Sequence, residues 1–218
     1  MSFRTNELQE AAKAVLTTTK MILGAEARHS RVTVVGGLAV VQLTHYYRAT
    51  KDVDLFLGGN LRPKQLKLEL PRANRAFTTN LEAVNGVSYR SLTTKILTAI
   101  DFLDINVVCS LISKSCIRNN KNSKTAFEPQ TRILDELKAE EMPRATRDDL
   151  ISMKAFGASK RDELKKLLQD IADIRTILLK HPGPLLFAGS AAAEANKEFV
   201  KEFLPFLAQH SDWSEEQW

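Results

Sequence analysis

The chain has 218 residues, of which 44% are hydrophobic and 26% are charged, and its formal net charge is +5. This length accommodates one large domain or two small ones, and the composition is normal for a globular core. The charged N-terminal sequence lacks the apolar stretch of a signal peptide, and no later run approaches the ~20 apolar residues of a membrane span, so we expect a soluble, cytoplasmic protein without a membrane partner. The mild positive charge permits a polyanionic partner such as RNA without requiring one.

The first predicted element is a helix from Thr5 to Gly24, whose apolar residues recur at near-helical spacing. Val32 to Val35 are rich in β-branched residues and stop at Gly36-Gly37, which is typical of a short buried strand and a tight turn. No Pro or Gly interrupts the sequence from Leu38 to Arg48, so a helix of about three turns is expected there. The glycines would then lie at a helix N-terminus, where backbone N–H groups and the helix dipole can bind phosphate. A purely structural strand-to-helix turn is the alternative.

Two acids alternate with apolar residues at the start of the next predicted strand, from Asp52 to Leu57. Residues two apart in a strand point to the same face, so Asp52 and Asp54 would stand side by side while Val53 and Leu55 face a core. Two adjacent carboxylates repel one another unless a cation neutralises them, and Mg²⁺ is bound through one or two carboxylates together with substrate phosphates. The alternative is a strand end with two solvated acids.

The segment from Arg62 to Arg75 concentrates five basic residues around Pro63, which suits a first helical turn, and Pro71, which suits a break. These basic residues would form a wall beside the acids that neutralises a triphosphate or grips a nucleic acid, or they would be a solvated helix face. The pattern then predicts a β-hairpin with strands Leu81 to Val84 and Val87 to Ser91, joined by a turn at Asn85-Gly86.

The alternation from Phe102 to Val107 predicts a strand that carries Asp104 in an otherwise apolar setting. Asp101 lies just before it, and a shift of one residue in the strand register would exchange the faces on which the two acids lie. The two cysteines that follow, Cys109 and Cys116, are too few for a disulfide framework or a structural zinc site, so we expect reduced, inert thiols.

The last third of the chain is predicted to be helical. Thr146 followed by Asp148 and Asp149 is typical of a helix start, and a clear 3.6-residue apolar stripe runs from Leu164 to Leu178. Lys154 lies among apolar neighbours, where burial is costly without an anion; that anion would be a phosphate or a carboxylate of the next helix, Asp170 or Asp173. A further helix is expected from Ser190 to His210, with Pro205 kinking or ending it.

One stretch of the sequence resembles the minimal nucleotidyltransferases of the DNA polymerase β superfamily, especially their AbiEii-like branch. It contains the Gly36-Gly37 turn followed, one helix later, by an Arg-x-Thr and an Asp-x-Asp, which are Arg48, Thr50, Asp52 and Asp54. The gap between the glycines and the acids is slightly longer than in the compact members. A second, weaker match is the lysine-bearing helix with Lys154 and the basic and acidic residues after it.

That resemblance implies an α/β (α+β) nucleotidyltransferase-fold core, residues 1–128, with a mixed sheet flanked by helices. A helical C-terminal region, residues 129–218, would pack on the core. The implied activity is transfer of a nucleoside monophosphate from an NTP to a hydroxyl of RNA or tRNA, a protein or a small molecule.

The same resemblance implies the roles of single residues. Asp52, Asp54 and a third carboxylate from the neighbouring strand would hold two magnesium or manganese ions; we favour Asp104 for the third and keep Asp101 as its competitor. Gly36 and Gly37 would bind the phosphates through their backbone N–H groups, and Lys154 would offset the phosphate charge. Arg48 and Thr50 complete the predicted nucleotide-binding set, with bracing of the aspartate strand as their expected task.

Two other classes of protein fit the same sequence. One is a nucleotidyltransferase-fold protein without catalysis that binds a nucleotide, or nothing, and acts through a partner. The other is a basic RNA-binding protein, whose affinity for RNA would be sensitive to salt and would survive substitution of Asp52 and Asp54.

Overall fold

The computed structural model describes residues 3–45, 47–80, 84–108, 129–185 and 190–218, with the backbone alone for 190–199. The described residues divide into two compact units. The first contains the residues up to Val107 together with Thr131–Ala145, and the second contains Thr146–Trp218 with the described residues Val108, Pro129 and Gln130. The segment Thr131–Ala145, which lies beyond the predicted boundary at residue 128, adds a strand to the sheet of the first unit. Cys109 and Cys116 lie outside the described residues.

The first unit is built on a mixed sheet. Its elements in chain order are α1 (Phe3–Leu23), the 3₁₀ helix η1 (Gly24–His29), β1 (Ser30–Val35), α2 (Gly36–Leu43), β2 (Asp52–Gly59), α3 (Pro63–Ala73), β3 (Phe77–Thr79), β4 (Gly86–Arg90), β5 (Leu97–Asp104), β6 (Arg132–Ile133) and the 3₁₀ helix η2 (Leu134–Glu136). The strands lie in the order β3-β4-β5-β2-β1-β6. Only the central pair, β2 and β5, is parallel; the other neighbours in the sheet are antiparallel.

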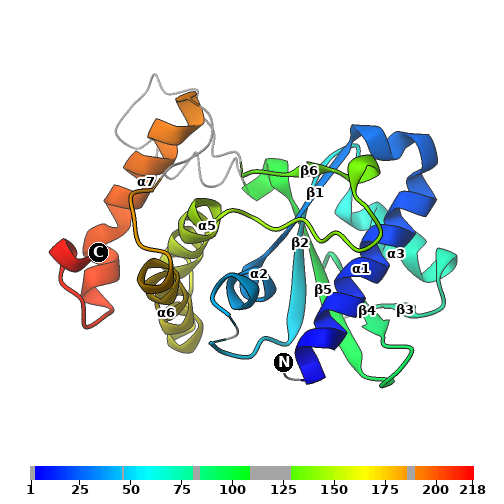
Figure 1. The fold of residues 1–218 in the computed structure, drawn as a ribbon, viewed down its shortest axis with the longest axis horizontal. Coiled ribbons are helices and arrows are strands. Elements are labelled where there is room, and N and C mark those ends of the chain that lie inside the picture. Colours follow the sequence, from blue (N-terminus) through cyan, green and yellow to red (C-terminus); the bar gives the residue numbers. More distant parts are fainter. Residues whose placement is uncertain (1–2, 46, 81–83, 109–128, 186–189) are drawn as a thin grey trace. The chain divides into compact units, whose positions relative to one another are not determined.

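Helices cover both faces of this sheet (Figure 1). α1 and α3 lie together on one face, against β5, β4 and β3, whereas α2 lies on the other face beside β1 and β2. Alternate residues of β2 and β5 point to the α1 side and are buried, among them Val53, Leu55, Ile100 and Phe102. Their neighbours in the sequence, including Asp52 and Asp54, point to the α2 side. From Asp52 to Leu55 the period-two pattern thus places apolar side chains on one face and the two acids on the other. Further along β2 both faces are buried, since Phe56, on the face of Asp54, is 1% exposed.

The second unit is helical. Its elements are α5 (Arg147–Ser159), α6 (Leu164–Lys180), α7 (Ser190–Gln209) and the 3₁₀ helix η3 (Glu215–Gln217). The predicted start of α5 is confirmed, because the Thr146 hydroxyl accepts a hydrogen bond from the Asp149 N–H as an N-cap. α6 buries its apolar stripe against α5. Within the described residues, none of the helices combines the length and apolar composition that a membrane span requires.

Three local predictions need correction. The strand that pairs with β4 is Phe77–Thr79, so the connection to β4 is longer than a two-residue Asn85-Gly86 turn. Of the predicted first strand, Leu81 to Val84, residues 81–83 lie outside the described residues and Val84 lies in a turn. The helix after the glycines ends at Leu43, well before Arg48. Pro71 does not break α3, which continues to Ala73. α7 continues past Pro205 to Gln209, so of the two predicted effects of Pro205 the kink stays a prediction.

Candidate active site

Asp52 and Asp54 begin the central strand β2 and lie on its α2 face. The alternation of the sequence explains this placement, because Val53 and Leu55 between and after them are completely buried on the opposite face. Asp52 and Asp54 themselves are half-buried. The two carboxylates therefore lie at the boundary between the core and solvent, where a ligand can reach them.

The backbone of Gly36 lies directly against the carboxylate of Asp54. Val35, the last residue of β1, pairs with Asp54 in the antiparallel ladder, so the turn that follows β1 passes beside this side chain. Gly36 has a φ of +63°, and a Cβ built on it would lie 1.8 Å from Asp54 Oδ2. Only glycine combines this backbone conformation with so close an approach. The two halves of the motif are thus in contact, as a phosphate-binding turn next to a metal-binding acid would require.

Gly37 and the segment before β2 form a second contact of the same kind. A Cβ on Gly37 would lie 2.4 Å from Thr50 Oγ1 and 3.4 Å from Arg48 Nη2. Thr50 Oγ1 in turn donates a hydrogen bond of 3.1 Å to Asp52 Oδ1. Arg48 Nη1 donates to the Ala49 carbonyl at 2.9 Å. Thr50 therefore orients Asp52, which is the bracing task that we predicted for it, and the guanidinium of Arg48 lies beside the Gly-Gly turn.

The strand register places Asp101, and not the favoured Asp104, on the face of Asp52 and Asp54. β2 and β5 are parallel, and Asp54 pairs with Asp101, so these two side chains point to the same face. Asp104 pairs with Leu57, three residues further along, and therefore points to the opposite face. Its Oδ1 accepts a hydrogen bond of 2.9 Å from the backbone N–H of Asn106, which gives it a local structural task at the end of β5. Asp101, the competitor, is the acid that joins Asp52 and Asp54.

A hollow of about 470 Å³ opens over Asp54 and Asp101. Its remaining wall consists of Asn80, Val84 and Asn85 from the connection between β3 and β4, with Phe102 and Leu103 of β5. The sequence did not predict this wall. The one signal for it was the Asn85-Gly86 pair, which we interpreted as turn chemistry alone.

The electrostatics of the face favour a bound cation. Burial, and then the negative charge of Asp52, raise the pKa of Asp101 above its ordinary value. A divalent cation would relieve both effects, since it replaces lost hydration and neutralises the repulsion between the carboxylates.

The donor set matches an open magnesium site and not a closed one. Within the described part of the chain, no three or more His, Cys, Asp or Glu side chains form a group that could hold a metal ion by themselves. Mg²⁺ commonly takes only one or two protein carboxylates and completes its shell with water and substrate phosphates. The carboxylates of Asp54 and Asp101, with Asp52 beside them, fit that second arrangement.

Lys154 of the second unit lies in a buried ion-pair network. Its Nζ is 2.6 Å from Asp170 Oδ1 and 2.9 Å from Asp173 Oδ2, and Asp170 also pairs with Arg161 Nε at 3.1 Å. Burial acts to lower the pKa of Lys154, but the charges of Asp173 and Asp170 outweigh it and raise that pKa above its ordinary value. The carboxylate alternative is therefore the one that the structure contains. A contact of Lys154 with phosphate stays a prediction, and burial of the lysine does not require it.

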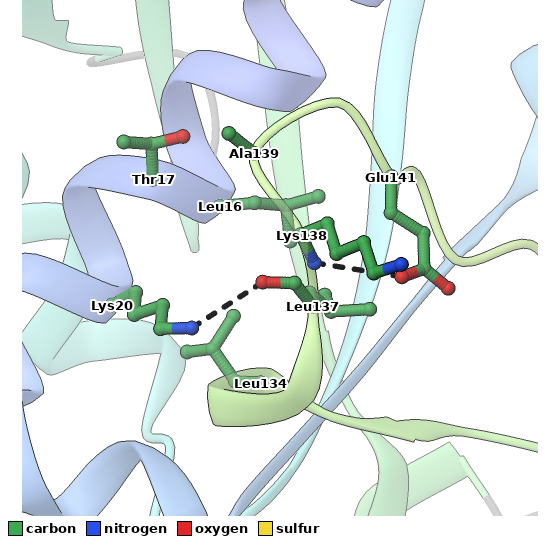
Figure 2. Close-up of a pocket in the computed structure, with 8 residues that line it drawn as sticks. All are labelled: Leu16, Thr17, Lys20, Leu134, Leu137, Lys138, Ala139 and Glu141. Carbon is green, nitrogen blue, oxygen red and sulfur yellow. Dashed lines mark hydrogen bonds between the residues drawn. The ribbon is translucent and has the colours of Figure 1, made fainter.

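A second hollow, of about 170 Å³, lies between α1 and the segment after η2 (Figure 2). Leu16 of α1 faces Leu134 and Leu137 across it, and the polar groups at its rim are already paired: Lys20 Nζ donates to the Leu137 carbonyl at 3.3 Å, and the Lys138 N–H donates to Glu141 Oε2 at 3.5 Å. It contains none of the predicted site residues, and we assign no function to it.

Comparison with known proteins supports the fold. No model of a known protein family matches the chain, and no curated protein matches it either. Among solved structures, the chain is similar to the crystal structure of an antigenic nucleotidyltransferase-like protein from Paracoccidioides brasiliensis, with a TM-score of 0.51, 18% sequence identity and 91% of each chain covered. At this identity the likeness shows the fold, and the chain has a nucleotidyltransferase-like α/β fold. It does not single out the AbiEii-like branch.

Gly36→Ala tests the contact with Asp54, and Gly24→Ala is its matched control. Both glycines have positive φ, but a Cβ on Gly24 would meet no atom within 4 Å. Gly24→Ala should therefore cost only the backbone strain, about 1 kcal/mol of unfolding free energy. Gly36→Ala should cost more, roughly 2–4 kcal/mol, because Asp54 must also move. Equal losses in denaturant unfolding of the two variants would contradict the contact.

Lys154→Met tests the ion-pair network. Removal of the lysine takes away the cation that buried Asp170 and Asp173 share, although Arg161 still pairs with Asp170. We therefore expect the free energy of unfolding of the second unit to fall by about 3–5 kcal/mol. Adding Asp170→Asn and Asp173→Asn to the same variant should restore most of this loss, because the buried charges are then gone. Chemical denaturation followed by circular dichroism measures both effects, and a loss below about 1 kcal/mol in the single variant would show that the network contributes little.

Proposed function

We propose that the protein is a metal-dependent nucleotidyltransferase that transfers a nucleoside monophosphate from an NTP to an acceptor hydroxyl and releases pyrophosphate. The observation that carries this proposal is the placement of three features on one face of adjacent strands: the Gly36 turn after β1, Asp54 on β2 and Asp101 on β5. The nucleotidyltransferase-like fold agrees with it. The motif also suggests the AbiEii-like branch of the superfamily, and that assignment is part of the proposal.

Each residue receives a task from its position. Asp54 and Asp101 would hold the magnesium, or manganese, ions. Asp52 would add negative charge to the same face, in the orientation that its hydrogen bond from Thr50 gives it. The backbone N–H groups of Gly36 and Gly37, at the N-terminus of α2, would hold the phosphates of the NTP. When bound, such ions would supply Lewis-acid activation of the acceptor oxygen and positive charge for the departing pyrophosphate. Arg48, whose guanidinium lies beside Gly37, adds positive charge next to the phosphates.

The hollow over Asp54 and Asp101 gives the substrate its place. The acceptor oxygen would attack the α-phosphorus while the bond to the bridging oxygen of the β-phosphate breaks, so that the nucleotide is joined to the acceptor, pyrophosphate leaves and the proton of the acceptor hydroxyl passes to water. The chain contributes mainly orientation and charge to this step. The acceptor is RNA, tRNA, a protein or a small molecule in this proposal.

Asp101→Asn and Asp104→Asn form the sharpest pair of variants for this site. We expect Asp101→Asn to reduce transfer from an α-labelled NTP in the presence of Mg²⁺ by on the order of 100-fold or more, because a metal ligand is lost. Asp104→Asn should keep nearly full activity, since the amide oxygen can still accept from the Asn106 N–H and points away from the site. Loss of activity in Asp104→Asn with a native melting temperature would reject our assignment of the third acid.

The raised pKa of Asp101 also predicts a gain in stability when its charge is removed. A group whose pKa is raised by folding stabilises the protein below its unfolded pKa, here 3.8, and this contribution is lost as the pH rises through the raised value. At pH 7 Asp101→Asn should therefore melt at a higher temperature than the wild type, and the difference should shrink as the pH approaches 3.8. Thermal unfolding at several pH values measures this; a lower melting temperature at pH 7 would contradict it.

A nucleotide-binding module without catalysis is the second candidate. The observation in its favour is that the described residues provide no closed group of three metal ligands. Calorimetry with Mg²⁺ and each NTP separates the two functions: binding that survives Asp54→Asn, without any transfer to RNA or protein acceptors, would support the module, whereas binding and transfer that are both lost would support the enzyme.

A further inference from the structure

The helix α3 and its two ends carry most of the net charge of the protein. Between Arg62 and Arg75 the sequence has five basic residues and one acid, a difference of +4 out of the chain's net +5. The acid, Glu69, accepts a hydrogen bond from Gln65 at 3.0 Å. The remaining 204 residues, 218 minus these 14, are close to neutral as a whole. Positive charge is therefore concentrated on one element and is not spread over the surface.

The helical period places these charges on the solvent side of α3. Pro63, Leu66 and Leu70 are buried and turn toward the sheet. Lys64 and Arg72 are eight residues apart and exposed, and Leu68 lies midway between them with 58% of its surface exposed. Two cations about 12 Å apart thus flank an apolar side chain on one face of the helix.

The exposed basic side chains of α3 and its two ends form no ion pair within the described part of the chain. We call Arg62, Lys64, Arg72 and Arg75, all of them exposed, the α3 basic face. None of the four forms an ion pair with a described residue; Arg62 donates only to the Gly59 carbonyl, at 3.3 Å. By contrast, Lys154 and Arg161 of the second unit are paired with carboxylates.

The α3 basic face is connected to the candidate active site within the same unit. Lys67, on the flank of α3, donates a hydrogen bond of 3.2 Å to the carbonyl of Val84. Val84 belongs to the wall of the hollow over Asp54 and Asp101, and 81% of its surface is exposed. Val84 is thus the point at which the flank of α3 meets the rim of this hollow. Because α3 and the acids of the hollow lie on opposite faces of the sheet, a chain of phosphates along α3 would have to pass Val84 to reach them.

We propose that the α3 basic face binds a single-stranded polynucleotide and guides its end to the hollow. Unpaired Lys and Arg side chains in a row are the usual electrostatic contacts to a phosphate backbone, and exposed Leu68 and Val84 offer apolar contact to unstacked bases. A membrane surface would require a broad apolar face, and the core of a protein interface is depleted in Lys. The role of the bound strand as acceptor rests on the proposed function, but the binding itself does not.

The test is the salt dependence of binding, measured by fluorescence anisotropy with a labelled, mixed-sequence single-stranded RNA. The variant is Lys64→Ala with Arg72→Ala in the full chain. Loss of two phosphate contacts should reduce the slope of log K against log salt by about 1.4 and weaken binding roughly 25-fold at about 0.1 M salt. The matched control, Lys138→Ala with Lys165→Ala, removes the same charge from two other exposed positions and should leave the slope unchanged.

Several results would overturn the proposal. One is an equal loss of RNA affinity in the matched control, and another is the absence of salt-dependent RNA binding by the wild type. The third is wild-type binding to vesicles with anionic headgroups that is stronger than binding to RNA and is lost with Lys64→Ala and Arg72→Ala. The wild type itself distinguishes the failure of this proposal from the failure of the proposed function. RNA binding by the wild type that is weakened by Lys64→Ala with Arg72→Ala, without any transfer from an NTP, would refute the enzyme and retain the α3 basic face.

Discussion

The contact between the Gly36 backbone and the Asp54 carboxylate is the constraint on which the candidate site depends. β1 and β2 are antiparallel, and their register brings the turn after Val35 beside Asp54. A side chain at position 36 would collide with Asp54 Oδ2, so a phosphate-binding turn and a metal-binding acid can share this place only if the residue is glycine. β5 then adds Asp101 on the other side of Asp54. Three strands therefore bring backbone donors and carboxylates to one point.

Buried charges are paired in the second unit, whereas acids of like charge lie near one another in the first. In the second unit, Lys154 is surrounded by Asp170 and Asp173, so the charges compensate one another and join α5 to α6. In the first unit, Asp52 and Asp101 repel one another, and burial adds to the effect on the pKa of Asp101. A compensated group stabilises structure, whereas an acid whose pKa is raised by burial and by a neighbouring carboxylate is a common feature of functional sites.

The sequence predicted local patterns well and pairings between distant segments poorly. The alternation after Asp52 predicted the strand and the common face of the two acids, and the Thr146 cap predicted the start of α5. The sequence could not decide between Asp104 and Asp101, because the register between β2 and β5 depends on packing across the sheet and not on either strand alone. For the same reason the sequence predicted β3 too far along the chain and left both a carboxylate and a phosphate as possible partners of Lys154. Close approach at Gly36 likewise follows from pairing and cannot be read from the glycine itself.

The most direct test of the central claim is the position of the metal. Crystals grown with Mn²⁺ and a non-hydrolysable NTP would locate the ion through its anomalous scattering. The account predicts a peak within ligand distance of both the Asp54 and Asp101 carboxylates, with the phosphates of the nucleotide against the Gly36-Gly37 turn. A nucleotide bound at the turn while these acids remain without an ion, or a metal held by Asp104 on the opposite face, would contradict it.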